Sequence, residues 1–309
     1  MYYRLARRIA GQRRSQLVAR TLFIKESEWQ GQETSRQTYN FDLCVINREL
    51  EKQNRTIFDM QPIDWKRIVK KREWTYKTQR RKISAVRTFL RLREITEHFM
   101  FDLERPLGTR KVPRRLKPWQ RDKVLQATCR QREILGIRNR AIIWTFWDLG
   151  IRKFELCGAL LADLDLDPEE PNLQLLTKAA TGRNGKYLPR AYELKVYIHD
   201  EAVDAMKAWL TVRNQLADSE TKTIFVSQIG GQPMTTAGIT YLFSYLSKLV
   251  GFRLSAHDFR RGAGTDAVER GIPDRFVMKQ LGLRTHAVFQ QYTARARLSR
   301  YRKLMRGEA

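Results

Sequence analysis

The stretch SAHDFRRGAGTDAVERGIPDRFVMKQLGLRTHAVFQQYT, residues 255–293, decides how the rest of the chain is interpreted. It opens on an H-x-x-R pair, His257 and Arg260, and it ends beside a tyrosine, Tyr292. Residues three apart lie on one face of a helix, so the imidazole and the guanidinium can face the same point. Each residue alone is weak evidence, because such a histidine also occurs in caps and cores, and Tyr301 rivals Tyr292.

The composition points to a polyanionic partner. The 309 residues are 42% hydrophobic, which is enough for two domains with buried cores. Lys and Arg number 59 against 33 Asp and Glu, a net charge of +26 that folding does not require. A polyanion is the natural partner of so basic a surface. A membrane-surface protein is the alternative, but only residues 1–20 weakly resemble a basic anchor, and no apolar run could span a bilayer.

Cysteine usage argues against several kinds of site. Cys44, Cys129 and Cys157 are odd in number and form no C-x-x-C pair, so neither a disulfide framework nor a zinc site is expected. No other cluster has metal-ligand spacing, and we expect no metal and no cofactor. Free cysteines fit a reducing compartment, and the basic start lacks the apolar segment of a secretory signal, so a cytoplasmic protein is expected.

A domain boundary is predicted at RPLGTRKVPRRLKP, Arg105–Pro118, which holds three prolines between periodic segments. We predict a helical N-terminal domain over 1–107, a linker over 108–118 and a second domain over 119–309 that ends in a tail helix. Apolar spacing predicts helices over 35–53, 75–95, 117–129, 136–151, 200–217 and 235–251.

Residues 172–200 follow a different pattern. Two or three short strand-like runs are broken by the turn sequence TGRNGK, residues 181–186, which predicts a hairpin or a three-stranded sheet. The predicted fold is therefore mainly α with a small β-sheet, of the α+β class.

A basic stretch runs from Lys66 to Lys82, with nine Lys or Arg residues against a single acid, Glu73. A solvated helix face with aromatic residues turned to the core is one interpretation. The charge of the whole chain favours the other, a surface that contacts phosphates. The candidates for DNA binding are Lys70, Lys71, Lys77, Arg80, Arg81 and Arg87.

Two further residues complete a set that cleavage of a phosphodiester by a tyrosine would need. Arg152 lies in LGIRKFEL, and Lys178 ends the strand-like run LQLLTK. A phenol is a weak nucleophile at neutral pH, so it needs a proton acceptor and a positive field. Two arginines suit the phosphorane oxygens, because each offers a planar fork of donors. A lysine can protonate the leaving 5′ oxygen as a general acid.

These motifs resemble those of the tyrosine recombinase, or phage integrase, family, including its Xer-type members. LGIRKFEL is similar to the family pattern TGLRxxEL, HDFRRGAGT to HxLRHxxAT, and LGLRTHAVFQQYT to LGHxxxxxTxxYT. In the N-terminal half, TYKTQRRKISAVRTFLRL resembles more loosely the DNA-contacting helix of the family's core-binding, SAM-like domain. The resemblance implies a core-binding domain followed by a tyrosine-recombinase catalytic domain.

The resemblance also implies a role for each matching residue. Tyr292 attacks the scissile phosphate, forms a 3′-phosphotyrosyl link and frees a 5′ hydroxyl, without ATP or metal. Arg152 and Arg260 hold the non-bridging oxygens, and His257 assists proton transfer. Lys178 protonates the leaving oxygen, with Lys186 as its rival in the same hairpin, and Glu155 supports the site. The expected partner is specific double-stranded DNA, held by a homotetramer.

One position departs from the family pattern. The family usually has His, sometimes Trp, after the LG of the third motif, whereas this chain has Leu283. Leucine cannot donate a hydrogen bond to the phosphate. By analogy with oxyanion holes, losing one donor costs about 2–4 kcal/mol of transition-state stabilisation. His286, about one turn later, is a candidate stand-in, although the turn of a helix should direct it elsewhere.

Several functions share these features. The leading prediction is a site-specific recombinase of the integrase or resolvase type. A transposase with the same chemistry is barely separable, and a type IB topoisomerase is disfavoured by the compact Xer-like length. A DNA-binding relative that has lost catalysis is the alternative from another class. The basic tail, with Leu298, Tyr301 and Met305 at helical spacing, could pack on a neighbouring protomer or lie on DNA.

Overall fold

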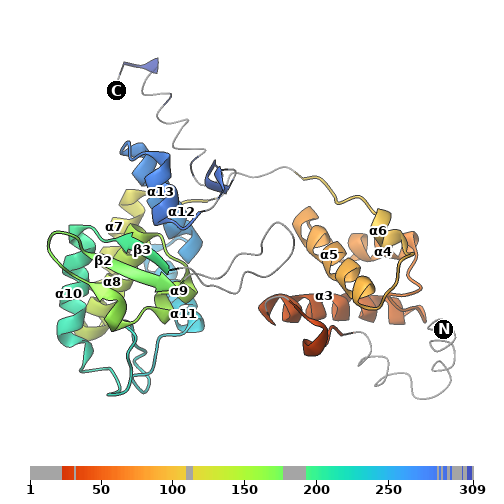
Figure 1. Cartoon of the computed structure of the whole chain (residues 1–309), viewed down its shortest axis with the longest axis horizontal. Helices are drawn as coiled ribbons and strands as arrows, with labels where there is room; N and C mark the ends of the chain where they lie inside the picture. Colours follow the sequence, from red (N-terminus) through yellow and green to blue (C-terminus); the bar gives the residue numbers. More distant parts are fainter. Residues whose placement is uncertain are drawn as a thin grey trace. The chain divides into compact units, whose positions relative to one another are not determined.

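The structure is a computed structural model that describes residues 23–30, 33–108, 114–176, 193–283, 285–286, 288–290, 293, 301 and 305–307. The chain forms two compact units, Met1–Arg110 and Lys111–Ala309 (Figure 1). The division falls inside the segment predicted as a linker. Residues that follow it are attached to the second unit, since the backbone N–H of Leu116 donates to the Asp258 carbonyl at 3.0 Å.

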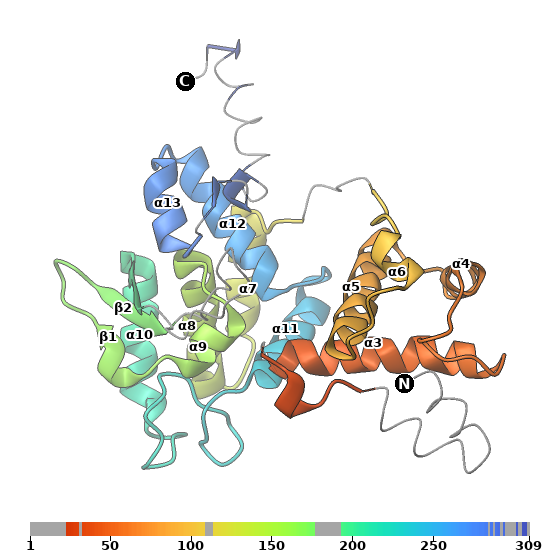
Figure 2. The same cartoon turned by 45° about the vertical axis from the view of Figure 1, so that its right-hand side comes forward.

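The first unit is helical, as its apolar spacing predicted. Its core forms where Leu43, Ile46 and Leu50 meet Ile83 and Phe89, with all five side chains buried. Figure 2 shows this unit turned by 45°. Within its described residues, the elements are the 3-10 turn η1 (Glu26–Glu28) and the helices α3 (Glu33–Glu51), α4 (Pro62–Lys71), α5 (Tyr76–Leu92) and α6 (Phe99–Asp102).

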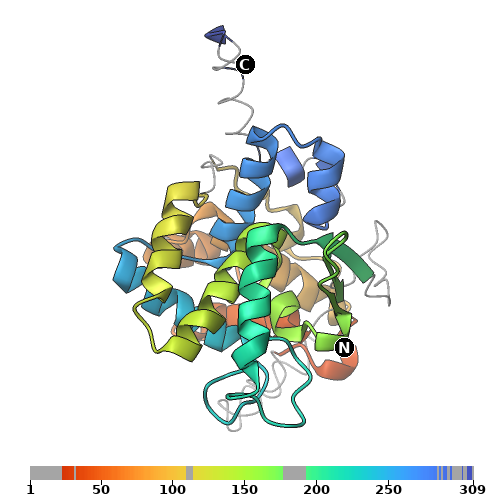
Figure 3. The same cartoon turned by 90° about the vertical axis from the view of Figure 1, so that its left-hand side faces the viewer.

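The second unit is built around α8 (Glu133–Leu149), which packs against α7 (Pro118–Thr128), α10 (Asp200–Arg213) and α12 (Ala256–Glu269). Ile142, Ile143 and Phe146 on α8 are fully buried, because neighbours cover this helix on several sides. Figure 3 views the unit with α10 in front. The other helices among its described residues are α9 (Lys153–Gly158), α11 (Thr236–Val250) and α13 (Asp274–Gln280), with the 3-10 turn η2 (Leu161–Asp163).

The predicted small sheet has three antiparallel strands in the order β1-β2-β3, namely β1 (Leu164–Asp165), β2 (Asn172–Leu176) and β3 (Glu193–Tyr197). Leu173 pairs with Val196, and both side chains are buried against the helices. The α+β class is confirmed. Residues 177–192 between β2 and β3 lie outside the described residues, and so do the two candidate lysines, Lys178 and Lys186.

The end of the chain is described only in part. A small apolar cluster of Val268, Val277, Leu281 and Phe289 joins α12 and α13 to the segment that follows them. Tyr292 and most of the predicted tail helix lie outside the described residues. Among the helices of the described ranges, none has the length and apolar character needed to cross a membrane.

Candidate active site

The H-x-x-R pair lies in the first turns of α12. Ser255 precedes this helix as its cap: its hydroxyl accepts from the Asp258 backbone N–H at 3.3 Å and lies 2.8 Å from the Asp258 carboxylate. The cap fixes where the helix begins and therefore which face carries His257 and Arg260. The His257 residue is exposed, whereas Arg260 is 2% exposed.

The Arg260 guanidinium joins the three sequence motifs. Its Nη1 donates to the carbonyl oxygen of Gly150 at 2.6 Å, two residues before Arg152. Its Nη2 donates to the carbonyl oxygen of Leu281, the first residue of the LG pair in the third motif. Charge-assisted hydrogen bonds are the stronger kind, so one side chain ties together backbone segments that are distant in the sequence.

The close approach of these segments depends on glycine. Gly150 ends α8 in the left-handed region with φ of 57°. A Cβ there would lie 2.3 Å from Cδ2 of Leu281, and a Cβ at Gly264 would lie 2.8 Å from Cδ1 of the same side chain. Leu281 therefore packs directly against two glycines, Gly150 two residues before Arg152 and Gly264 four residues after Arg260.

The Glu155 carboxylate holds Arg152 in place. Arg152 is the N-cap of α9, and its backbone N–H donates to the Glu155 carboxylate at 2.7 Å. The Arg152 Nη1 donates to the other carboxylate oxygen at 2.7 Å. The Glu155 side chain is buried, whereas 35% of the Arg152 side chain is exposed. The carboxylate thus fixes the guanidinium while leaving part of it at the surface.

Positive charge gathers around the His257 imidazole. Although His257 is exposed, its imidazole is partly desolvated, which lowers its pKa below the usual value. The charges of Arg261, Arg260 and Arg152 lower the pKa further against the opposing effect of Asp258. The guanidiniums of the first and second motifs are therefore close enough to act on one imidazole. A neutral imidazole can accept a proton, and the surrounding arginines favour an anionic group beside it.

Leu283, at the position where the family has His or Trp, packs with the apolar cluster of Val277, Leu281 and Phe289. Its backbone N–H donates to the Met278 carbonyl at 2.8 Å. His286 lies one turn later with its Nε2 3.4 Å from an Asp274 carboxylate oxygen and its ring against Phe289. The described partners of His286 thus come from α13 and from its own segment.

A histidine that the sequence did not single out ties the sheet to this site. His199, between β3 and α10, donates its backbone N–H to the Asp148 carboxylate at 2.8 Å, and its Nδ1 contacts the other carboxylate oxygen. The hydrogen bond with Asp148 raises the pKa of His199, against the opposing effect of burial. Because Asp148 lies two residues before Gly150, this pair connects the end of β3 to the first motif. No local pattern marks such a pair.

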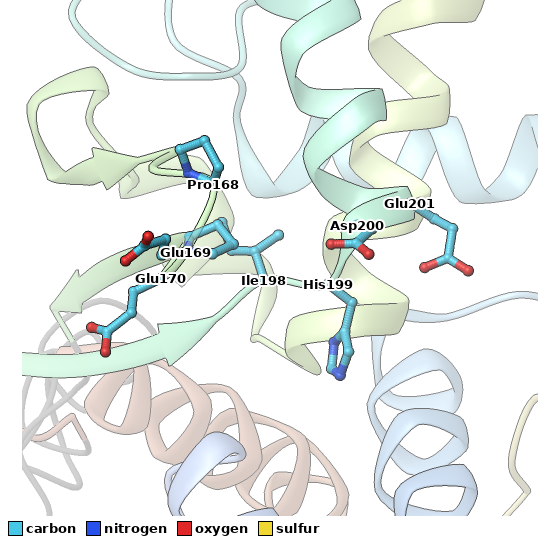
Figure 4. A pocket seen from close by; sticks show the side chains of 8 residues that line it. Pro168, Glu169, Glu170, Ile198, His199, Asp200 and Glu201 are labelled. Carbon is cyan, nitrogen blue, oxygen red and sulfur yellow. The ribbon is translucent and has the colours of Figure 1, made fainter.

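Figure 4 shows the hollow beside His199, which has a volume of about 420 Å³. Its lining is acidic, with Glu169 and Glu170 on one side and Asp200 and Glu201 on the other. It contains none of the residues of the three motifs. The structure thus brings together Arg152, Glu155, His257 and Arg260 in a different place from this hollow.

The candidate DNA-binding residues of the first unit differ in their surroundings. Arg87 donates to the carbonyl oxygens of Met100 and Leu103 at 2.6 and 2.5 Å, which braces α6. Arg81 makes a two-pronged pair with buried Asp42 at 2.7 and 2.8 Å, and Lys71 pairs with Glu49 at 2.8 Å. Lys71 and Arg81 are nevertheless exposed, and so are the remaining candidates, Lys70, Lys77 and Arg80.

The comparisons with known proteins agree with the family that the three motifs indicate. The model of the phage integrase family matches residues 114–298. The tyrosine recombinase XerC of Leptospira interrogans is 29% identical over 265 residues, which are 82% of this chain and 80% of that protein. XerC of Listeria innocua is 26% identical over 294 residues, 90% of this chain and 92% of that protein.

Solved structures show the same fold at low identity. A XerH site-specific recombinase bound to its palindromic difH substrate, in a post-cleavage complex, has a TM-score of 0.69 at 16% identity and covers 88% of this chain and 80% of its own. A lambda integrase tetramer bound to a Holliday junction has a TM-score of 0.64 at 15% identity, with 85% and 72% of the two chains covered.

Proposed function

The chain belongs to the phage integrase family and is a site-specific DNA recombinase, and we propose that it cleaves DNA with Tyr292 through a 3′-phosphotyrosyl intermediate. The observation that carries this proposal is the set of contacts made by Arg260. These contacts join the three motifs. The charges of Arg152, Arg260 and Arg261 also act together on the imidazole of His257.

The two motif arginines stabilise the charge that develops on the phosphate. Arg152 is held by Glu155 and is partly exposed. Its guanidinium is therefore already in place when a phosphate binds, and it can donate to a non-bridging oxygen. Arg260 is nearly buried, and its charge acts where the effective dielectric constant is low. Both guanidiniums favour the phosphorane over the diester, because charge builds up on its oxygens during attack.

The proton transfers follow from the remaining residues. The phenolic oxygen of Tyr292 bonds to phosphorus, and its proton passes to the neutral imidazole of His257. The bond from phosphorus to the 5′ oxygen breaks, and that oxygen takes a proton from Lys178. Attack by a 5′ hydroxyl of a second strand reverses these steps and releases Tyr292. The energy of the diester is kept in the covalent link, so no ATP is consumed.

Leu283 removes one donor from this arrangement. The contacts of His286 with Asp274 and Phe289 favour a structural role for that histidine over that of a stand-in. We therefore assign stabilisation of the phosphorane mainly to the two arginines. A slower cleavage step than in a relative with His at this position is the expected consequence.

The partner in this proposal is duplex DNA bound by a homotetramer that holds two sites together. The net charge of +26 supports a polyanionic partner. Solved relatives of the same fold are described in complex with DNA, among them the XerH and lambda integrase structures.

A nicked duplex that traps the covalent link tests the proposal. Candidate sites drawn from the DNA flanking the gene are incubated with the wild-type protein and with Tyr292→Phe, and the products are separated on a denaturing gel. A covalent adduct with the wild type alone is expected. An adduct with both proteins would exclude Tyr292 as the nucleophile.

The second candidate function is a DNA-binding relative without catalysis. The observation that favours it is that Leu283 packs against an apolar cluster. The family usually has a hydrogen-bond donor to the phosphate at this position. This alternative predicts that both proteins shift the DNA on a native gel and that neither forms an adduct on any of several sites.

A further inference from the structure

The first unit places buried carboxylates beneath exposed cations. Glu49, on α3, has a side chain that is only 4% exposed. Its carboxylate accepts from Lys71 at 2.8 Å and from Arg72 at 2.5 Å, both at the end of α4, and from Lys52 at 3.2 Å. Figures 1 and 2 show α4 beside the C-terminal end of α3. We call these four residues the Glu49 cluster.

The cations of the Glu49 cluster keep much of their surface in solvent. The exposed fractions of the side chains are 58% for Lys52, 55% for Lys71 and 41% for Arg72. The hydrogen bond from Lys71, followed by those from Lys52 and Arg72, lowers the pKa of Glu49 to about 2, against the effect of burial. The carboxylate therefore stays ionised, and the cluster carries two net positive charges.

Such an arrangement is a poor way to gain stability. Pairs with exposed cations contribute little to folding, and an ionised carboxylate that leaves water costs free energy. What the arrangement does is fix the positions of the cations. Long Lys and Arg side chains usually lose rotamer freedom when they bind a ligand, and side chains that are already held lose less. A second buried acid repeats the design, since Asp64 holds Arg55 at 2.5 Å and Arg67 at 2.6 Å.

We propose that Glu49 is a positioning residue that holds Lys52, Lys71 and Arg72 as a preformed contact for the phosphates of the DNA backbone. A hollow of about 150 Å³ beside the cluster is lined by Glu49, Lys52, Arg67 and Lys71, with Gln53 and Ile68. Three cations against one carboxylate favour an anion there. The inference rests on the proposed action on DNA, and it adds Lys52 and Arg72 to the candidate contacts.

The direction in which one substitution changes DNA affinity distinguishes a positioning role from a simple charge effect. Glu49→Gln removes a negative charge from a basic surface, and Coulomb's law alone predicts tighter DNA binding. If Glu49 positions its three cations, the same substitution weakens binding. Glu73→Gln is the matched control, because Glu73 is an exposed acid in the turn after α4. Its neutralisation should leave binding unchanged or strengthen it.

The measurement is the affinity of the full chain for a fluorescent duplex of random sequence, by anisotropy, over a series of KCl concentrations. The slope of log affinity against log salt reports how many phosphates are neutralised. We expect Glu49→Gln to lower the magnitude of this slope by roughly one, with weaker binding at every salt concentration. Glu49→Asp, which keeps the charge, should restore part of the loss. An unchanged or steeper slope in a folded Glu49→Gln protein would overturn the proposal.

A second comparison decides the matter if Glu49→Gln does not fold. The double variant Lys71→Gln/Arg72→Gln loses two charges, and so does Lys207→Gln/Lys222→Gln on exposed positions of the second unit. The first should reduce the salt slope by roughly two and the second by much less. Equal reductions would overturn the proposal. Wild-type protein that fails to bind DNA at all would instead sink the proposed function together with this inference.

Discussion

The Nη1 atom of Arg260 lies 2.6 Å from the carbonyl oxygen of Gly150, a residue 110 positions earlier in the chain. This contact sets the distance between the helix that carries the H-x-x-R pair and the loop that leads to Arg152. It depends on a glycine that adopts a left-handed conformation and allows Leu281 to approach. A side chain at position 150 should therefore destabilise the second unit, and the loss of stability can be measured.

Gly150→Ala should destabilise the second unit and abolish cleavage. The left-handed conformation costs about 1–2 kcal/mol for alanine, and the overlap with Leu281 adds about 1–3 kcal/mol. Thermal unfolding checks the sum. Gly271→Ala, at φ of 85° with open space around its Cβ, isolates the conformational part. Equal losses in the two variants would show that the contact with Leu281 contributes nothing.

Glu155→Gln should slow cleavage more than it destabilises the fold. The carboxylate orients the Arg152 guanidinium at 2.7 Å, and without its charge that side chain gains freedom. Misplacement of one charge-stabilising group is expected to cost roughly tenfold to a hundredfold in rate. Single-turnover formation of the covalent adduct measures it. Glu155→Asp keeps the charge but withdraws it, so an intermediate rate is expected; a wild-type rate in Glu155→Gln would exclude the supporting role.

The pH dependence of cleavage should follow the lowered pKa of His257. The neutral imidazole is the active form, and partial desolvation together with three nearby arginines lowers its pKa below that of an ordinary histidine. The acid limb of the rate profile should therefore lie below about pH 6.5, the usual value for histidine. His257→Gln should lose this limb together with much of the rate. A limb that persists in His257→Gln would belong to another group.

Stability should depend on pH through His199, whose pKa is raised where that of His257 is lowered. The pKa of His199 is raised in the fold by Asp148, so the pair contributes its full stability below the unfolded pKa of about 6.5. That contribution is lost as the pH rises through the higher folded pKa. Melting temperatures of the wild type and of His199→Gln, measured from pH 5.5 to pH 9, should therefore converge at the alkaline end. Parallel curves would contradict the assignment.

Leu283→His tests whether the missing donor limits the rate. The imidazole could supply a hydrogen bond to the phosphate, with a gain of roughly tenfold or more in adduct formation. The cost is lost packing with Val277, Leu281 and Phe289, about 1 kcal/mol or more of unfolding free energy. Leu283→Ala is the control for lost packing. A rate equal to that of Leu283→Ala would show that this position does not face the phosphate.

Much of the architecture could be predicted from the sequence because its signals are local. The apolar spacing of Leu43, Ile46 and Leu50 predicted α3, and the broken strand-like runs after Asn172 predicted a small sheet. The spacing of His257 and Arg260 placed them on one helix, since the helical repeat depends only on neighbours. The three motifs likewise identified the family before any distance was known.

Long-range packing accounts for what periodicity could not reveal. The charge run from Lys66 to Lys82 does not say that Glu49 and Asp42 lie beneath it, because those acids come from another helix. Arg87 has the pattern of a surface residue, yet its donors go to the carbonyls of α6 and its flank. The partners of Arg260 and His199 are backbone and carboxylate groups more than 20 residues away. Such contacts depend on how whole helices meet, and no local repeat encodes that.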